Sequence, residues 1–347
     1  MICSAAFVKV FAFFPHAVEL YYSNGVYPYI GQTQRMLLGW IPFSIGDVLY
    51  SIFFIYCLRK GYLLLRAVLK KQATRTMFLH AGKRVLFACL LIYTLFNLLW
   101  GLNYNRLPMA QQMDLGLERY STLNLTNLLQ VLAARLNNLD SASRSFRAPL
   151  TKKRLLFNET INTYSVAARQ YPALRYKTPS VKPSIFSYAG NYLGFTGYYN
   201  PFSGEAQSNT LVPAFIQPFT TCHEIGHQLG YAKENEANFA GFLAARSSSN
   251  PAFRYSLYFD MYSYASRELY RRDSTRAKEQ HKLLNLQVKK DYETIRNFYL
   301  KYENPLEPVI HKLYGQFLRA NQQPQGIRSY NEVVAMLLAF YKKYGEI

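Results

Sequence analysis

The sequence predicts a mainly α-helical protein with a small β-sheet (α+β), in which apolar helices come first and a globular domain follows. Residues 1–105 contain long apolar runs and only two of the twenty acidic residues. In residues 106–347, apolar residues recur at the spacing of amphipathic helices, except in a stretch rich in Pro, Gly and aromatic residues that suits strands and loops. With 347 residues, 50% of them hydrophobic, the chain can form a membrane anchor and one globular domain.

Two apolar runs predict membrane-spanning helices. Residues 85–103 are nineteen residues without a charge, and about 20 residues of helix cross a hydrocarbon core of about 30 Å. Residues 41–65 form a second candidate, which Asp47 weakens and whose basic side chains could reach the interface.

A third apolar run, residues 2–20, gives a weaker signal. Lys9 interrupts it and Pro15 stops its first half, and its length would also suit the core of a signal peptide. Because neither a basic leader nor a small-residue cleavage site accompanies it, a retained anchor is the favoured interpretation. Residues 1–105 are therefore expected to form a membrane anchor of two to three transmembrane helices, with the lipid bilayer as a partner.

The distribution of basic residues predicts the orientation of this anchor. Residues 59–84 contain eight Lys and Arg and no acid, whereas residues 16–40 contain one residue of each sign. Because cytoplasmic loops are enriched in Lys and Arg, we expect residues 59–84 in the cytoplasm and residues 106–347 outside it. The net charge of +20 does not indicate a nucleic-acid partner, because membrane topology already explains the densest basic run.

One short motif constrains function more than any other part of the chain. It reads His-Glu-Ile-Gly-His and contains His223, Glu224 and His227. On a helix, residues four apart share a face, so both imidazoles can bind one ion while Glu224 leans over a vacant coordination position. A catalytic zinc holds three protein ligands and a water, whose pKa falls to about 7, and a neighbouring carboxylate takes the proton.

The motif therefore predicts the active-site helix of a zinc hydrolase, with Zn²⁺ as cofactor. In this interpretation His223 and His227 are metal ligands and Glu224 is the general base. Two alternatives stay open, because so short a pattern also arises by chance and because residues 221–224 fit a helix capping box, in which Glu224 would be structural.

A third metal ligand is expected on a second helix, which begins after Gly230. Glu234 lies on a stripe of small residues that could pack closely on the first helix, and Asn238, one turn later, could hydrogen-bond a ligand histidine. Glu236 is the alternative, but it lies about 200° around the helix from Glu234, so both cannot bind one ion. We favour Glu234, although either could be a solvated acid at a helix start.

The remaining elements follow from periodicity and turn residues. Helices are expected at residues 123–139, 153–171, 253–270, 309–320 and 330–344, strands at 184–188 and 210–214, and a loop or edge strand at 197–208.

Two further roles can be assigned only loosely. An extended substrate often adds a strand to a sheet edge, and residues 200–206 are the candidate edge, with a packed turn as the alternative. A tyrosine could stabilise the transition state. Tyr255 is the candidate, with Tyr258 and Tyr262 on the same helix, but most of the thirty tyrosines are expected to be packing residues.

The motifs also carry a resemblance. His-Glu-x-x-His followed by Glu-x-x-Ala-Asn resembles the gluzincin branch of zinc metallopeptidases, in which the first Glu of the second pattern is the third ligand. Over most of its length the chain resembles the membrane-anchored bacterial proteins of domain of unknown function 3810. The motifs that carry this resemblance lie at residues 182–184, 197–206, 223–230, 234–239, 255–256 and 326–330.

The resemblance implies a bacterial, membrane-anchored zinc peptidase with a zincin-like domain, and it names no target. With the orientation predicted from loop charge, this domain lies on the periplasmic side of the cytoplasmic (inner) membrane, and a peptide or protein substrate is the expected partner. Only six residues separate His227 from Glu234, fewer than in many gluzincins, so a tight turn at Gly230 must supply the geometry.

Two classes of function remain. The first is a membrane-anchored, zinc-dependent metallopeptidase, and the second is a zinc-stabilised, non-catalytic binding or sensor domain on a membrane anchor. Glu224 favours the first, because a structural zinc is more often closed by a fourth protein ligand such as Cys. Hydrolysis of another amide, such as one in a cell wall, would use the same chemistry and is not distinguished by the sequence.

Overall fold

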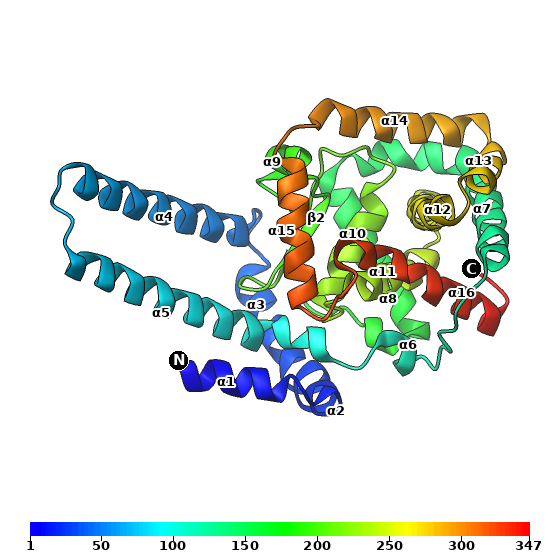
Figure 1. Cartoon of the computed structure of the whole chain (residues 1–347). Coiled ribbons are helices and arrows are strands. Elements are labelled where there is room, and N and C mark those ends of the chain that lie inside the picture. Colours follow the sequence, from blue (N-terminus) through cyan, green and yellow to red (C-terminus); the bar gives the residue numbers. More distant parts are fainter.

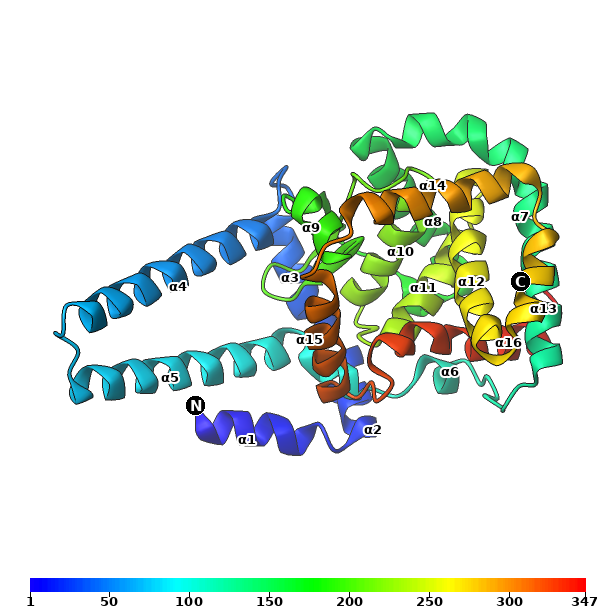
Figure 2. The same cartoon turned by 45° about the horizontal axis from the view of Figure 1, so that its top comes forward.

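The chain folds into a long helical hairpin that projects from one side of a mainly helical body (Figure 1, Figure 2). The computed structural model describes residues 1–347, apart from the side chain of Tyr330. Helices make up 74% of the chain, and the body contains one three-stranded sheet. The predicted class, mainly α with a small sheet, is confirmed.

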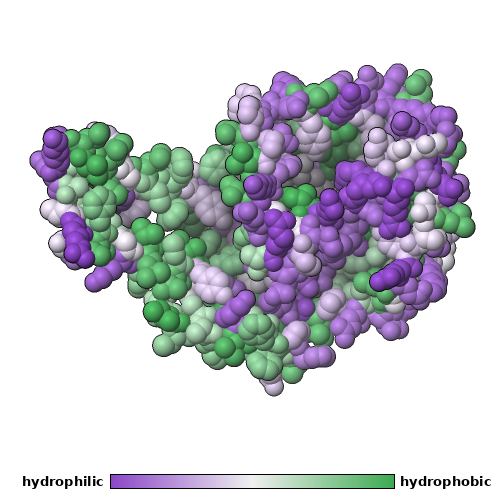
Figure 3. All heavy atoms as spheres, viewed as in Figure 1, coloured by the Kyte–Doolittle hydropathy of each residue, from purple (hydrophilic) through white to green (hydrophobic). Residues whose placement is uncertain are grey.

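The hairpin consists of α4 (Ile45–Leu69) and α5 (Arg75–Leu99), both long and apolar enough to cross a membrane. Each begins at a side-chain cap, because Ser44 accepts a hydrogen bond from the Asp47 amide and Thr74 accepts one from the Met77 amide. Both helices therefore differ by several residues from the predicted spans, and α5 includes basic residues of the expected loop. Hydrophobic residues cover most of the hairpin, with hydrophilic residues at its tip, whereas the visible part of the body away from the hairpin is mainly hydrophilic (Figure 3).

The apolar run at residues 2–20 does not form one straight helix. Helix α1 (Ile2–Phe11) ends before Pro15, where α2 (Pro15–Ala17), a π-helix η1 (Val18–Val26) and α3 (Tyr27–Leu38) continue the chain. The two parts meet at 98°, so they would make a third span only as one broken pair.

Residues 16–38 are helical and pack on the body, although beyond residue 20 we expected no element there. Glu19 forms a buried ion pair of 2.8 Å with Arg106, and Arg35 donates a hydrogen bond to the Thr178 carbonyl. Residues on the two sides of the expected boundary at residue 105 are therefore packed against one another.

Helices around a central pair form the body. The pair consists of α10 (Gln217–Gln228) and α11 (Glu234–Arg246), against which α8 packs, while α12 packs on α7. The other helices are η2 (Gly101–Asn105), α6 (Met109–Gln112), α7 (Thr122–Leu150), α8 (Lys153–Gln170), η3 (Pro172–Leu174), α9 (Ser187–Leu193), α12 (Pro251–Arg272), α13 (Ser274–Lys282), α14 (Leu286–Tyr302), α15 (Glu307–Ala320), η4 (Gly326–Glu332) and α16 (Val333–Tyr344). All five helices predicted for this part are present, with shifted ends.

The sheet has the order β1-β3-β2, with β1 (Val181–Pro183) parallel to β3 (Glu205–Ser208) and β2 (Gly197–Asn200) antiparallel to it. The segment expected as a loop or edge strand is thus a hairpin.

Both other strand predictions were wrong, because side chains fold the backbone into turns at these places. Ser184 accepts a hydrogen bond from the Phe186 amide just before α9, and Asn209 accepts one from the Leu211 amide.

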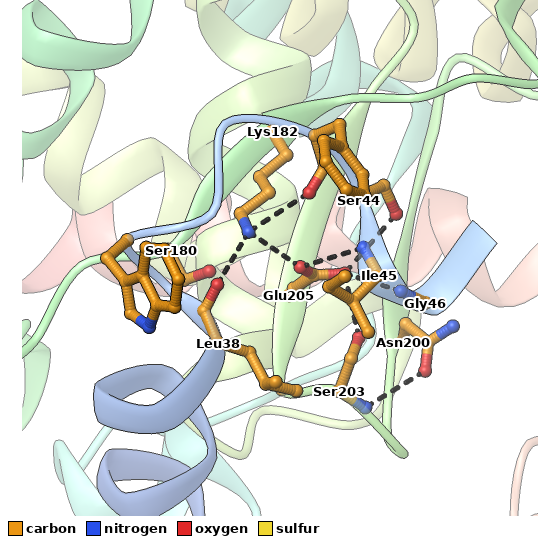
Figure 4. A network of polar contacts seen from close by, with 12 residues as sticks. Leu38, Ser44, Ile45, Gly46, Ser180, Lys182, Asn200, Ser203 and Glu205 are labelled. Carbon is orange, nitrogen blue, oxygen red and sulfur yellow. Dashed lines mark hydrogen bonds and ion pairs between the residues drawn. The ribbon is translucent and has the colours of Figure 1, made fainter. Parts of the chain in front are cut away.

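A buried ion pair fastens the start of α4 to this sheet (Figure 4). Lys182 on β1 lies 2.8 Å from Glu205 on β3, and their side chains are 3% and 0% exposed. Lys182 also donates to the Leu38 carbonyl, while Glu205 accepts from the Gly46 amide at 2.8 Å. The segment between α3 and α4 is therefore held on the sheet by bonds from both charged groups.

Asp47 belongs to the same junction. It accepts hydrogen bonds from the Tyr198 hydroxyl at 2.6 Å and from the Ile185 amide at 2.7 Å. This carboxylate, which weakened the prediction of the second span, therefore lies in the body rather than among the apolar residues of α4.

Candidate metal centre

Three side chains from α10 and α11 converge inside the body. One ligand atom from each of His223, His227 and Glu234 lies within 4.8 Å of the others, and all three residues are buried. The Nε2 atoms of His223 and His227 lie 3.2 Å and 3.4 Å from Oε2 of Glu234. The structure thus brings together the three residues that the motif and the small-residue stripe indicated.

Glycines allow the two helices to approach this closely. A Cβ atom on Gly226 would lie 3.0 Å from the Ala237 carbonyl oxygen, and one on Gly241 would lie 3.2 Å from the His223 amide nitrogen. Helix α10 ends in a left-handed turn at Gly230, with φ of +90°. Such a φ costs glycine little, so six residues suffice to reverse the chain and return Glu234 to the histidines.

Each histidine is oriented through its Nδ1 atom. Nδ1 of His227 lies 2.9 Å from the Tyr231 carbonyl oxygen, and Nδ1 of His223 lies 2.8 Å from Oδ1 of Asn238. A carbonyl oxygen can only accept, so Nδ1 carries the proton and Nε2 of the neutral ring presents its lone pair to Glu234. Asn238 thus lies where the sequence suggested a supporting hydrogen bond.

This arrangement fits a bound cation. With neutral rings, two nitrogen lone pairs and one carboxylate oxygen face one another, and these acceptors repel unless a positive charge lies between them. Two histidine nitrogens and one carboxylate oxygen are also a ligand set that catalytic zinc uses. The donor set therefore suits zinc and leaves a coordination position for a water.

The pKa values of the three ligand candidates shift in different directions. Burial raises the pKa of Glu234, but His227 and His223 outweigh burial, so the pKa of this carboxyl lies well below its usual range. Burial lowers the pKa of His227, but Glu234 and Glu224 outweigh it and the net shift is upward. For His223 burial prevails, and its pKa is lowered. Glu234 therefore stays ionised beside the imidazoles, as a ligand must.

Glu224 lies next to the cluster, and one of its carboxylate oxygens is available to a ligand. It is buried, and among the described residues its Oε2 atom has no hydrogen-bond partner. Burial raises the pKa of Glu224 to about 8, with Glu234 adding to the shift and His227 opposing it. A metal cation nearby would lower this pKa again. The carboxylate can thus exchange a proton near neutral pH.

Strand β2 lies against Glu224. A Cβ atom on Gly197 would come within 2.6 Å of Oε1 of Glu224, so only glycine fits without displacing the carboxylate. β2 pairs with β3 along one edge. Residues 200–206, the expected substrate edge, instead form the end of β2, the turn and the start of the central strand β3.

Other predicted candidates lie outside the cluster. Glu236 is buried and accepts a hydrogen bond from the Met109 amide. Tyr255 donates to the Asp291 carboxylate at 2.6 Å, and Tyr258 donates to the backbone carbonyl of Ile347. The structure therefore does not bring Glu236 or Tyr255 to the motif histidines.

Two contacts to the cluster were not foreseen. Tyr314 on α15 donates to Oε1 of Glu234 at 2.7 Å, and Nε1 of Trp100 donates to the His227 carbonyl oxygen at 2.9 Å. Trp100 lies within the predicted span of residues 85–103 and had no role assigned at the motif, and Tyr314 did not stand out among thirty tyrosines. Neither residue has a sequence signal that links it to a motif about 90 to 130 positions away.

Two cavities meet at the cluster. The larger has a volume of about 580 Å³ and the smaller about 250 Å³, and both are lined by Gly197, His223, Glu224 and Tyr314. Tyr255 lines neither. The candidate metal centre is thus open to ligands on two sides.

The comparisons with known proteins identify one family, and its function is unknown. The family described as "Protein of unknown function (DUF3810)" matches residues 22–338. Neither a search of curated proteins nor a search of solved structures gives a match. Since the matched region includes the hairpin, the sheet and both helices of the cluster, the chain belongs to the DUF3810 family.

Proposed function

We propose that this protein is a membrane-anchored, zinc-dependent metallopeptidase of the gluzincin type. The observation that carries the proposal is the convergence of His223, His227 and Glu234, with the carboxylate of Glu224 beside them and a cavity in front. A zinc ion bound there would lower the pKa of a water to about 7 and polarise the carbonyl group of a substrate.

Glu224 supplies the acid–base chemistry in this proposal. Its Oε2 atom has no hydrogen-bond partner among the side chains and backbone that the structure describes, and it can accept the proton of the attacking water. As the water oxygen bonds to the carbonyl carbon and the C–N bond breaks, the same carboxyl group returns the proton to the leaving amine. The products are one carboxylate and one amine, and no other reactant is needed.

Positioning residues support this chemistry. Tyr314 holds Oε1 of Glu234, which leaves Oε2 directed at the histidines. Asn238 and the Tyr231 carbonyl fix the two rings. A peptide could extend the sheet at β2, where Gly197 gives the backbone close access to Glu224. No separate residue is assigned to stabilise the transition state.

The proposal also includes the location of the protein. α4 and α5 anchor it in a bacterial cytoplasmic (inner) membrane, with the body on the periplasmic side, because the basic residues around the hairpin tip favour the cytoplasm. The expected partners are a peptide or protein substrate and the lipid bilayer.

The test combines metal content with turnover. The purified full chain should hold one zinc and hydrolyse a mixture of unstructured peptides. Glu224→Gln should keep the zinc and abolish hydrolysis, because an amide cannot accept the proton of water, whereas His223→Ala should lose both.

A second outcome favours the alternative function. If the wild type holds zinc, unfolds on its removal and hydrolyses no peptide, the domain is a zinc-stabilised, non-catalytic binding or sensor domain. Protein without zinc in fresh preparations would refute both assignments.

A further inference from the structure

The larger cavity extends from the candidate metal centre along the hairpin. At one end it is lined by the cluster, and at the other by Tyr50 on α4 and by Cys89 and Ile92 on α5. Ile92 precedes Trp100 by eight residues, about 12 Å along a helix at 1.5 Å per residue. The cavity therefore reaches the part of the hairpin that is apolar enough to lie in a membrane.

The walls of this cavity are apolar and aromatic. Apart from His223, Glu224, His227 and Glu234, none of the described lining residues is Asp, Glu, Lys, Arg or His. The other lining residues are Tyr50, Cys89, Ile92, Tyr93, Phe96, Trp100, Tyr104, Phe195, Gly197, Tyr198, Tyr199, Pro201, Phe202, Tyr314 and Phe317. Such walls suit apolar side chains and leave a charged ligand without partners.

The smaller cavity is more polar, although apolar residues such as Ile216, Phe219 and Ile327 also line it. It lies against the same cluster but is lined by Asp260, Arg267 and His311, together with Asn238 and Thr220. The cluster thus stands between an apolar space that runs along the hairpin and a polar space within the body. A substrate that fills both spaces must be apolar on one side of the bond that is cut and polar on the other.

Helix α15 gives this face of the body a further apolar surface. It lies beside the base of the hairpin (Figure 1, Figure 2), and Phe317 contacts Phe96 of α5 with ring centroids 6.2 Å apart. Its exposed residues Val309 and Leu313, and Leu306 just before its first residue, lie three and four positions apart, on one side of the helix. An amphipathic helix of this kind is typical of a protein surface that rests on a bilayer.

We infer that the substrate is a membrane-inserted polypeptide, cut just outside the bilayer. Its apolar segment enters between α4 and α5 and occupies the larger cavity, and its polar segment lies in the smaller one. This inference rests on the proposed peptidase function and adds the class of substrate. The inference depends on the continuity of the apolar cavity with the cluster. Through this cavity, a peptide bond next to a membrane-inserted segment can reach Glu224 without crossing the polar surface of the body.

The test compares one peptide library in two forms. The full chain is placed in phospholipid nanodiscs and given short randomised peptides, either free or joined to an apolar transmembrane helix. The helix is joined to the amino terminus of the peptides in one set and to the carboxyl terminus in another. The joined form should be cleaved with at least about tenfold higher kcat/KM, a typical effect of apolar contacts in an enzyme pocket. Equal cleavage of the two forms would overturn the inference.

Confinement to a membrane alone raises the local concentration, so a matched pair of variants is needed. Ile92 lines the cavity and is 39% exposed; Leu98 does not line it, lies on the other side of α5 and is 43% exposed. Ile92→Trp should lower the ratio of joined to free cleavage about tenfold, because it fills the cavity. Leu98→Trp should leave the ratio unchanged, and one zinc per chain in both variants shows that they fold.

A crosslinking experiment tests the substrate inference separately from the proposed peptidase function. A photoreactive residue in place of Ile92, in the Glu224→Gln variant, should crosslink the joined peptide and not the free one. If this crosslinking occurs but the wild type cleaves neither form, the substrate site stands and the peptidase proposal fails. Crosslinks to lipid alone, or the same ratio for Ile92→Trp and Leu98→Trp, would overturn the inference.

Discussion

The ion pair between Lys182 and Glu205 should contribute strongly to stability, because water cannot reach either charge. Lys182→Met removes one charge and leaves Glu205, which is 0% exposed, with neutral donors such as the Gly46 amide. Breaking a buried pair in this way costs about 3–5 kcal/mol of the free energy of unfolding. At about 2–4 °C per kcal/mol for a domain of about 150–250 residues, Tm should fall by about 6–20 °C.

The assay is thermal unfolding of the full chain in detergent, followed by intrinsic fluorescence at one scan rate, because unfolding of such proteins is often irreversible. The matched control is Lys342→Met, whose partner is Glu118 and whose ion pair is 71% and 69% exposed. This control should change Tm little, because water and salt screen exposed charges. The reasoning is refuted if Lys182→Met lowers Tm no more than Lys342→Met does.

Three other perturbations test the site and its location. Glu234→Ala should weaken zinc binding by more than about 100-fold, which is the largest loss usual for a residue that only supports a metal ligand. Glu236→Ala should keep the metal. In a zinc titration, the reverse result would make Glu236 the ligand instead of Glu234. Gly197→Ala should keep zinc but lower kcat by up to about 100-fold, because the new methyl group displaces Glu224; unchanged turnover would contradict the proposed base. A reporter that is active only outside the cytoplasm should be active after Ile347 and inactive within residues 70–76, and the opposite pattern would place the body in the cytoplasm.

Local periodicity was enough to predict which side chains of α10 and α11 converge. His223, His227 and Glu234 come together because positions four apart share a helix face and because a glycine turn joins two helices with small residues between them. Whether this cluster binds zinc stays a prediction. Asn238 followed from the same stripe of residues.

Long-range contacts and local turns account for what the sequence did not reveal. Tyr314 reaches Glu234 from 80 positions away, and no pattern near it indicates that partner. The strand expected at residues 184–188 fails because the Ser184 hydroxyl accepts a backbone hydrogen bond and starts a turn. Buried tertiary contacts such as Glu19 to Arg106, which join residues far apart in the sequence, hold the helices of residues 16–38 in place.

The hydrogen bond from Trp100 to the His227 carbonyl oxygen joins the end of a hairpin helix to a residue of the metal cluster. The Tyr22 hydroxyl holds the same end of α5 by donating to the Leu98 carbonyl oxygen. The hairpin is therefore part of the framework of the candidate metal centre rather than a tether, and a shorter chain beginning at residue 106 would lack this support. We therefore expect a change in the tilt of α5 to be transmitted through the Trp100 hydrogen bond to the carboxyl end of α10, where His227 lies.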